Sequence, residues 1–352
     1  MTKANYPGKV ILFGEHSIVY PGHNAVIIPI DLQARAEAEI IQGEQKIIFQ
    51  EPNSSWFKEP FECTFESAIS TYTMLKDLHS KSEYEEIDRA LHEDFGFLRA
   101  LFGLILIEVR KSSENTIPSF GIILKVNIPY GSGFGSSAAY SAAIIHACMK
   151  LFGHSYSQKE IYDLVFKYES FIHKNPSGAD PAAVVYNQPI LFGHGESGNK
   201  TISKLSITNE QLSLVLRDAY IVQTGKPVQS TGEMVRYVRN KYEEDPEKYN
   251  EFFKQIDTIL DSFMKKNITQ ESMYDLVNRN GKLLEDIGVV SDSAIKFSEY
   301  IRKDAGAVKV VGAGGYGATT GSGAMIVCHK DSSYIKNCIK DFGFSLVDVF
   351  KK

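Results

Sequence analysis

Cysteine is scarce in this chain, and its few copies form no metal-binding or redox pattern. The four cysteines, Cys63, Cys148, Cys328 and Cys338, are scattered, with no CxxC pair and no histidine at zinc-ligand spacing. This distribution excludes a disulfide framework and a zinc site of the finger type. Cys148 and Cys328 lie within apolar stretches, so we expect both to be small residues of the core.

Long apolar runs and an excess of positive charge are also missing. No run reaches the roughly 20 residues that a membrane-spanning helix needs, and the start MTKANYPGKV has no apolar signal segment. The 38 Lys and Arg residues are outnumbered by 43 Asp and Glu, giving a formal net charge of −5. A negative balance argues against nucleic acid or an anionic membrane as the main partner. We therefore expect a cytoplasmic protein with no nucleic-acid and no membrane partner.

Apolar periodicity gives a mixed pattern of strands and helices along the 352 residues. Short apolar or alternating runs predict strands at residues 10–13, 25–30, 34–40, 121–128, 214–223, 308–311, 324–328 and 343–348. Helical spacing predicts helices at residues 65–78, 86–110, 138–152, 157–173, 230–242, 246–265, 270–287 and 332–341. The pattern further indicates a loop or irregular hairpin at 43–60 and a short hairpin at 182–192.

The fold class that this pattern favours is α+β. In the second half of the chain, strands at both ends enclose a run of helices, as in a two-layer α+β domain. The composition turns polar near residues 195–210, where GESGNKTISK stands. We therefore predict two domains, residues 1–205 and 206–352.

Residues 129–143, PYGSGFGSSAAYSAA, form the most informative stretch. Its glycines and serines leave backbone N–H groups free, and the apolar helix that follows contributes a partial positive charge at its N-terminus. Together they make a cradle suited to a polyphosphate. The stretch has neither the lysine of a P-loop nor the acidic residue of a dinucleotide fingerprint. Taken alone, it is equally consistent with a glycine-rich turn between a strand and a helix.

Three further stretches contain candidate functional residues, each with a plainer explanation. Lys9, Glu15 and His16 in PGKVILFGEH are consistent with ordinary polar residues at a strand edge and turn. Asp180 in HKNPSGADPAAVVYN is either a turn residue or a carboxylate among small neighbours that allow close approach of a ligand. The second glycine loop, KVVGAGGYGATTGSG at 309–323, is either a tight turn or a backbone that approaches a ligand.

The combination of these stretches resembles the GHMP family of small-molecule kinases. PGKVILFGEH is similar to the first family motif, PYGSGFGSSAAYSAA to the second and VVGAGGYGATTG to the third. The segment TGKPVQSTGEMV at 224–235 also resembles a family segment that opens the C-terminal domain. The resemblance extends from residue 7 to residue 321, nearly the whole chain.

The resemblance implies an ATP- and Mg²⁺-dependent kinase that acts on a small hydroxy acid. It implies an N-terminal domain like ribosomal protein S5 and a ferredoxin-like C-terminal domain, and it is compatible with a homodimer. Asp180 would be the general base or orienting acceptor, with Lys9 as its cationic partner, and Ser137 and Glu169 would be Mg²⁺ ligands. The acceptor pocket would include Glu15, His16, Ser230 and Thr231. The nucleotide phosphates would be bound by Gly131, Ser132, Gly133, Gly135, Ser136, Ser137, Gly314 and Gly315.

Two departures from the family pattern leave the acceptor open. Tyr316 stands where the family usually has glycine, and Tyr20–His23 is a longer turn than usual. Alternative acceptors are a phosphorylated hydroxy acid, for which Lys226 is a candidate cation, or a sugar. An alternative of another class is a non-catalytic ligand-sensing regulator with the same fold. The presence of Lys9, Ser137, Glu169 and Asp180 favours the kinase.

Overall fold

The computed structural model describes residues 1–52, 57–112, 116–174, 176–194, 199–205, 207, 209–265, 268–318 and 321–347. The chain forms two compact units. One comprises Met1–Gly8, Leu32–Pro129 and Gly135–Asn187, and the other comprises Lys9–Asp31, Tyr130–Phe134 and Gln188–Lys352. The long strands β1 (Thr2–Phe13) and β2 (Asn24–Ile40) each continue from one unit into the other. The predicted division at residues 205 and 206 stays a prediction.

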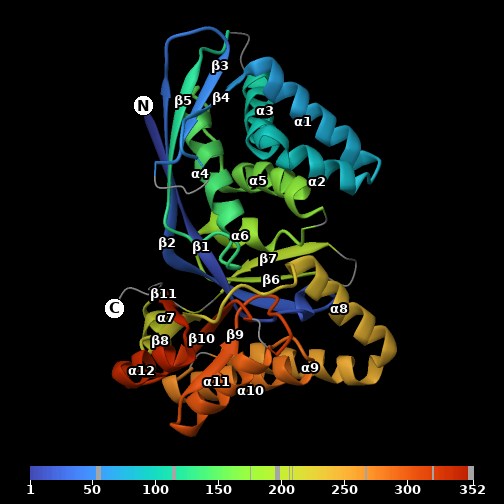
Figure 1. Ribbon diagram of the computed structural model, residues 1–352, viewed down its shortest axis with the longest axis vertical. Helices are drawn as coiled ribbons and strands as arrows, with labels where there is room; N and C mark the ends of the chain where they lie inside the picture. Colours follow the sequence, from blue (N-terminus) through green and yellow to red (C-terminus); the bar gives the residue numbers. More distant parts are fainter. Residues whose placement is uncertain are drawn as a thin grey trace. The chain divides into compact units, whose positions relative to one another are not determined.

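In the first unit, strands form a sheet with helices on one side (Figure 1). Strand β5 (Phe120–Val126) pairs antiparallel with the second half of β2 and parallel with β3 (Lys46–Gln50), which pairs antiparallel with β4 (Phe61–Thr64). Alternation along β2 buries Ala34, Ala36 and Ala38 on the helix side. The helices are α1 (Phe65–Ser80), α2 (Tyr84–His92), α3 (Gly96–Ser112), α4 (Ser136–Leu151), α5 (Gln158–His173) and α6 (Ala179–Tyr186), with the 3-10 turn η2 at Glu93–Phe95.

Local sequence explains where these helices begin and how closely they pack. The Thr64 hydroxyl accepts from the backbone N–H of Ser67 at the start of α1, and Ser157 forms a capping box with Glu160 at the start of α5. A Cβ at Gly103 in α3 would lie 2.2 Å from the carbonyl oxygen of Ala68 in α1. Glycine is therefore required where α1 and α3 touch.

The second unit has a four-stranded antiparallel sheet among the residues described, in the order β11-β8-β10-β9. Its strands are β8 (Ala219–Gln223), β9 (Ala307–Val310), β10 (Ala324–Cys328) and β11 (Ser345–Val347). Separately, the first residues of β2 pair with β6 (Ile190–His194), which pairs with β7 (Lys200–Lys204). The remaining elements are η1 (Ser17–Val19), α7 (Asn209–Val215), α8 (Thr231–Glu244), α9 (Pro246–Phe263), α10 (Gln270–Asp286), α11 (Asp292–Lys303) and α12 (Ser332–Phe342).

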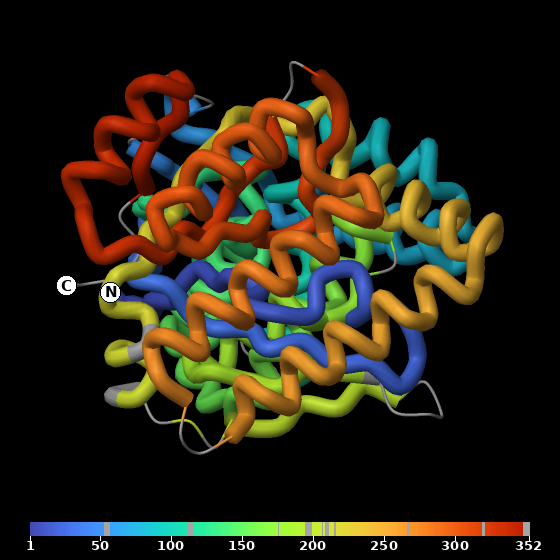
Figure 2. The backbone as a smooth tube through the Cα atoms, turned by 90° about the horizontal axis from the view of Figure 1, so that it is seen from below, coloured from blue at the N-terminus to red at the C-terminus, as the bar shows by residue number. Residues whose placement is uncertain are grey.

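Helices α9 and α10 run side by side in the second unit (Figure 2), and α10 and α11 pack against β9. Apolar residues at helical spacing on α9, including Phe252, Ile256 and Phe263, are buried. The ring of Phe263 packs edge-on against Phe13 of β1, with centroids 5.3 Å apart. In the described part of the chain, no helix combines the length and apolarity that a membrane span requires.

The structure corrects several predicted elements. The expected hairpin at 182–192 is wrong, because residues 179–186 form α6 before strand β6. The expected strand at 214–223 is a helix end followed by β8, and helix α11 was not predicted. The segment 43–60, predicted as a loop or irregular hairpin, contains β3, which pairs antiparallel with β4. Residues 53–56 lie outside the described part, as does residue 348 of the predicted last strand. Short apolar segments such as AAVVY have the same pattern in a buried helix and a buried strand.

Candidate active site

The loop from Gly131 to Ser137 has the backbone geometry of an anion cradle. Gly131, Gly133 and Gly135 have φ angles of 69°, 80° and 69°, in the left-handed region that glycine adopts without strain. Gly135 is the N-cap of α4, and as a glycine it has no side chain to cap the first N–H groups of this helix. The first turn also contains no acidic residue. The positive end of α4 is therefore suited to a bound anion.

Ser137, Glu169 and His173 meet beside this helix N-terminus. The Ser137 hydroxyl donates to Glu169 Oε2 at 3.0 Å, and His173 Nε2 lies 3.4 Å from the same oxygen. The Glu169 side chain is 1% exposed, and its Oε1 has no hydrogen-bond partner among the described residues. The sequence prediction paired Ser137 with Glu169, and the structure brings these two residues together. His173 was not predicted, although its position one helical turn after Glu169 places both on one face.

The oxygen atoms of Ser137 and Glu169 are suitable ligands for a divalent cation such as Mg²⁺. A hydroxyl and a carboxylate are the oxygen ligands that Mg²⁺ prefers, and Glu169 Oε1 leaves one buried carboxylate oxygen available. Across the described residues, no group of three or more His, Cys, Asp or Glu side chains is arranged to hold a metal ion. A cation here would therefore depend on phosphate oxygens and water for its remaining ligands.

Asp180 is the second residue of α6, and Lys9 lies within β1. Helix α6 begins after Gly178, whose φ of 91° sets the turn, and the Ala179 N–H donates to Ser177 Oγ at 3.2 Å. Asp180 is half-buried at the positive end of this helix, where a carboxylate is stabilised. Lys9 is 3% exposed and its backbone N–H donates to Phe134 O. The two residues belong to different compact units, and their pairing stays a prediction.

The turn after β1 holds Glu15 and His16 in buried positions. Gly14 is required here, because a Cβ would lie 2.5 Å from the Cα of Ala25. Glu15 forms an ion pair with Lys309 of β9, and Glu15 Oε2 has no partner among the residues that the structure describes. Burial raises the pKa of the Glu15 carboxyl, while the charges of Lys309 and Lys9 act in the opposite direction.

His16 is buried and neutral at ordinary pH. Its backbone has a φ of 63°, and its Nε2 lies 3.0 Å from the carbonyl oxygen of Ala313. A carbonyl only accepts, so we assign the proton to Nε2, which leaves Nδ1 as a hydrogen-bond acceptor. Burial lowers the pKa of His16 to about 4.

Lys309 is a charged residue that the sequence analysis did not single out. It stands in the apolar strand AVKVV, and its side chain is fully withdrawn from solvent. A lone lysine inside a run of β-branched residues was the available signal, because a buried lysine needs a partner of opposite charge.

The third glycine loop has packing requirements of its own. A Cβ at Gly314 would lie 2.1 Å from Val289 O, and one at Gly315 would lie 2.7 Å from Pro227 Cβ. These close approaches account for both glycines without a ligand, so their role in binding nucleotide stays a prediction. Tyr316 is 41% exposed, and its ring packs against the ring of Tyr237, with the two ring centroids 4.9 Å apart. Residues 319 and 320 lie outside the described part of the chain.

Ser230 and Thr231 stand at the start of α8. The Ser230 hydroxyl accepts from the Glu233 N–H at 3.3 Å, and the Glu233 carboxylate accepts from the Ser230 N–H at 2.7 Å. This capping box explains Ser230 locally. Both Ser230 and Thr231 are exposed. Their predicted place in an acceptor pocket stays a prediction.

Comparisons with a family model, with curated sequences and with solved structures agree on one protein family. Residues 100–188 match the model of the GHMP kinases N terminal domain. Mevalonate kinase of Pyrococcus furiosus is 30% identical over 325 residues, which cover 89% of this chain and 86% of that relative. The solved structure of mevalonate kinase of Methanococcus jannaschii has a TM-score of 0.76 and 20% identity, covering 99% of this chain and 98% of that one. The solved structure of mevalonate kinase of L. major in complex with R-mevalonate has a TM-score of 0.67 and 18% identity. The match covers 97% of this chain and 91% of that one.

The two solved structures share the mixed α/β fold of this chain over nearly its whole length. The Pyrococcus relative matches at 30% identity over most of both sequences, and the matched family segment contains the glycine–serine loop, Glu169 and Asp180. The chain belongs to the GHMP kinase family.

Proposed function

We propose that this chain is a mevalonate kinase, which transfers the γ-phosphoryl group of ATP to the 5-hydroxyl of mevalonate. The observation that carries the proposal is the contact of Ser137 with the buried Glu169 beside the N-terminus of α4, whose N-cap is a glycine. This arrangement offers backbone N–H groups for phosphate oxygens and two oxygen ligands for a cation in one place. Curated relatives named mevalonate kinase, such as those of Pyrococcus furiosus, Mus musculus and Schizosaccharomyces pombe at 30%, 27% and 25% identity, support this acceptor.

In this proposal, positioning and charge neutralisation do most of the catalytic work. The N–H groups of Gly131–Ser137 bind phosphate oxygens at the positive end of α4. Ser137 and Glu169 would hold Mg²⁺, and a cation bound there would supply charge neutralisation for the phosphate oxygens. The bond from the γ-phosphorus to the β–γ bridging oxygen breaks, and a new bond forms to the acceptor oxygen. Asp180 accepts the hydroxyl proton, with Lys9 as its cationic partner.

Glu15 and His16 are assigned to the acceptor. Neutral His16 presents Nδ1 as an acceptor for a substrate hydroxyl, since Nε2 is engaged with Ala313. Glu15 offers the oxygen that its ion pair with Lys309 leaves unpartnered. A hydroxy acid with two hydroxyl groups suits such a pair of acceptors. A homodimer and a cytoplasmic location stay predictions from the sequence.

The test is ADP release by the purified protein with Mg-ATP and one of four acceptors: mevalonate, phosphomevalonate, galactose or homoserine. We expect turnover with mevalonate, at a kcat within the usual range of about 1–100 s⁻¹ for kinases. Turnover only with another acceptor would retain the kinase and overturn the substrate. ATP binding without turnover on any of the four would favour the ligand-sensing regulator.

A further inference from the structure

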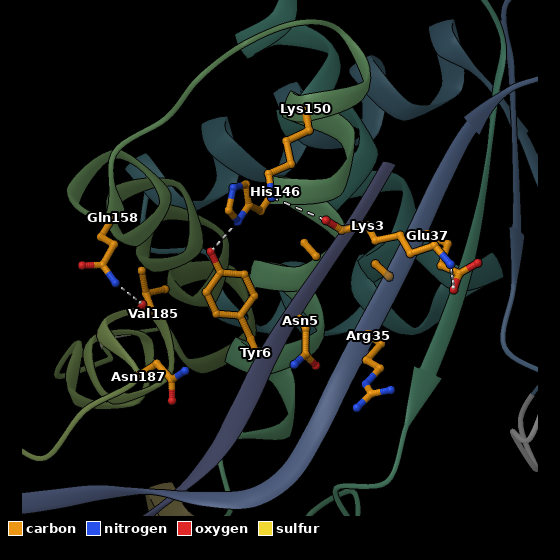
Figure 3. Close-up of a pocket in the computed structure, with 12 residues that line it drawn as sticks. Lys3, Asn5, Tyr6, Arg35, Glu37, His146, Lys150, Gln158, Val185 and Asn187 are labelled. Carbon is orange, nitrogen blue, oxygen red and sulfur yellow. Dashed lines mark hydrogen bonds and ion pairs between the residues drawn. The ribbon is translucent and has the colours of Figure 1, made fainter. Parts of the chain in front are cut away.

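A cavity lies within the first unit, away from the residues assigned to phosphoryl transfer. It has a volume of about 590 Å³ and lies among the start of β1, the last turns of α4, the start of α5 and the end of α6 (Figure 3). A volume of this size suits a small organic molecule. No residue of the glycine–serine loop and none of the proposed catalytic, metal or acceptor residues lines it.

The floor and the rim of this cavity differ in chemistry. The floor is made of buried apolar and aromatic residues: Ala4, Tyr6, Ala36 and Val185. The rim is made of exposed polar and cationic residues: Lys3, Arg35, Lys150, Gln158 and Asn187. An apolar floor under a polar rim favours a ligand with one apolar and one charged end.

The rim has an excess of positive charge. Lys3 Nζ pairs with Glu37 Oε1 at 2.9 Å, so these two charges cancel. Lys150 Nζ donates to the backbone carbonyl of Lys3 at 3.5 Å. Among the described residues, neither Arg35 nor Lys150 has a carboxylate within ion-pair distance. Two uncompensated cations match the charge of a dianion, and the guanidinium of Arg35 can bind two oxygens of one group.

Tyr6 and His146 add a neutral hydrogen-bond donor in the wall. The Tyr6 hydroxyl lies 2.8 Å from His146 Nδ1. Burial raises the pKa of Tyr6 to about 12, and burial together with the charge of Lys150 lowers the pKa of His146. Both groups are therefore neutral, and either tautomer of His146 leaves the pair one donor for a ligand, the Nε2–H or the Tyr6 O–H.

An adjoining smaller cavity shares two of these wall residues. It has a volume of about 280 Å³, and it is lined by His146 and Lys150 together with residues 153–156. In this wall, His154 Nε2 is buried and has no hydrogen-bond partner within the described part of the chain. A buried ring nitrogen without a partner is a group that a bound molecule or water would satisfy.

The cavity adjoins β1, which pairs with β2 and with no other described strand. A second copy pairing along this edge would place another strand against Lys3 of β1. Lysines at a sheet edge are a known device against such pairing. The charge therefore disfavours another strand as the occupant and favours a small anion.

We propose that this cavity binds a small organic phosphate. Arg35 and Lys150 bind the phosphate group, and the apolar part of the molecule lies on Tyr6 and Val185. The inference is independent of the proposed function, because it concerns binding by residues that take no part in phosphoryl transfer.

The test is isothermal titration calorimetry with phenyl phosphate, in saturating MgADP so that the glycine–serine loop is occupied. We expect one further site, with affinity reduced roughly tenfold or more in Arg35→Gln and in Lys150→Gln, since each removes a charged hydrogen bond. The matched control is Lys125→Gln. Lys125 is exposed and pairs in register with Arg35 across β2 and β5, but it does not line the cavity. The affinity of the Lys125→Gln variant for phenyl phosphate should equal that of the wild type.

Several outcomes would overturn the proposal. Absence of binding by the wild-type protein would do so, as would equal affinity in both variants and in the wild type. Equal affinity for benzoate and phenyl phosphate would overturn the assignment to a dianion. Self-association through β1 that excludes phenyl phosphate would assign this edge to a second copy. Thermal unfolding of each variant, compared with the wild type, checks that the substitutions leave the fold intact.

Discussion

Lys309 and Glu15, 294 positions apart in the sequence, form an ion pair whose side chains are 0% and 1% exposed. The pair joins strand β9 to the turn after β1 within the second unit. Burial lowers the pKa of Lys309, and the charge and hydrogen bond of Glu15 oppose this change. Removing both ions from water is costly, so each partner depends on the other.

Replacing Lys309 by methionine should therefore destabilise the fold strongly. Lys309→Met leaves Glu15 buried without its main partner, and we expect the free energy of unfolding to fall by about 3–5 kcal/mol. Urea denaturation followed by circular dichroism measures the change. The double variant Glu15→Gln/Lys309→Met should recover much of the loss, because no unpaired buried charge remains.

A matched control is Lys159→Met on α5. Lys159 pairs with Asp163 at the surface, with side chains 65% and 52% exposed. An exposed pair contributes only about 0–1 kcal/mol. A double variant less stable than Lys309→Met alone would contradict the charge-compensation argument.

His16 should make stability depend on pH in a defined window. The folded state keeps the ring neutral down to a pKa of about 4, whereas an unfolded histidine takes up a proton near its ordinary value of about 6.5. The unfolded state thus binds more protons between these values, and stability falls as pH falls from about 6.5 towards 4. The contribution is fully present above this window and is on the order of 3 kcal/mol.

The variant His16→Asn isolates this effect. Asparagine tolerates the positive φ at this position and does not titrate, and its shorter amide gives up the hydrogen bond of Nε2 to Ala313 O at every pH. The difference in unfolding free energy between wild type and variant should be constant above pH 6.5 and change steadily below it, since other titrating groups cancel. A difference that does not vary with pH between 7 and 4 would show that His16 titrates normally in the fold.

The elements that the sequence predicted well are those with long apolar periodicity or clear caps. Helix α5 begins at the predicted serine cap, and α4 follows the glycine–serine loop as expected. Helix α6 was mistaken for part of a hairpin because its eight residues, ADPAAVVY, are almost all apolar. Pro181 suggested a turn, although proline fits the first turn of a helix, where its missing N–H is not needed.

The candidate site was predictable only where one short motif holds the residues. The glycine–serine loop is continuous in the sequence, and its φ angles follow from its glycines. The contact of His173 with Ser137 joins two helices and depends on how they pack. The ion pair of Glu15 with Lys309 joins residues from opposite ends of the chain. Neither contact follows from local pattern, because pairing across a fold requires its topology.

Replacing Glu169 by glutamine should raise the magnesium requirement of the reaction. Glu169→Gln keeps the shape and the hydrogen bond from Ser137 but removes the charge that holds a divalent cation. We expect the Mg²⁺ concentration for half-maximal rate to rise by about tenfold or more. Initial rates at fixed ATP measure this directly, and binding of Mn²⁺ by electron paramagnetic resonance provides a readout without turnover.

Asp163→Asn is the control on the same helix. Asp163 is exposed and pairs with Lys159, away from Ser137. It should leave the magnesium dependence unchanged. An unchanged magnesium dependence in Glu169→Gln would remove Glu169 from the metal site.

Two substitutions of Asp180 separate a proton acceptor from an orienting group. Asparagine retains an oxygen that accepts a hydrogen bond from the substrate hydroxyl, but it takes up no proton; alanine offers neither. If Asp180 accepts the proton, Asp180→Asn and Asp180→Ala should both reduce kcat by about 10²–10⁴-fold. If it only orients the hydroxyl, Asp180→Asn should retain most of the rate and Asp180→Ala should not.

Neither substitution should unfold the protein, because Asp180 is half-buried on the first turn of α6 and its backbone position suits any short polar residue. Melting temperatures within a few degrees of the wild type confirm this, and KM values separate binding from turnover. We expect both variants to lose kcat together, since phosphoryl transfer to an alcohol must release the hydroxyl proton and the proposal assigns no other group to receive it. Wild-type kcat in both variants would instead remove Asp180 from the reaction.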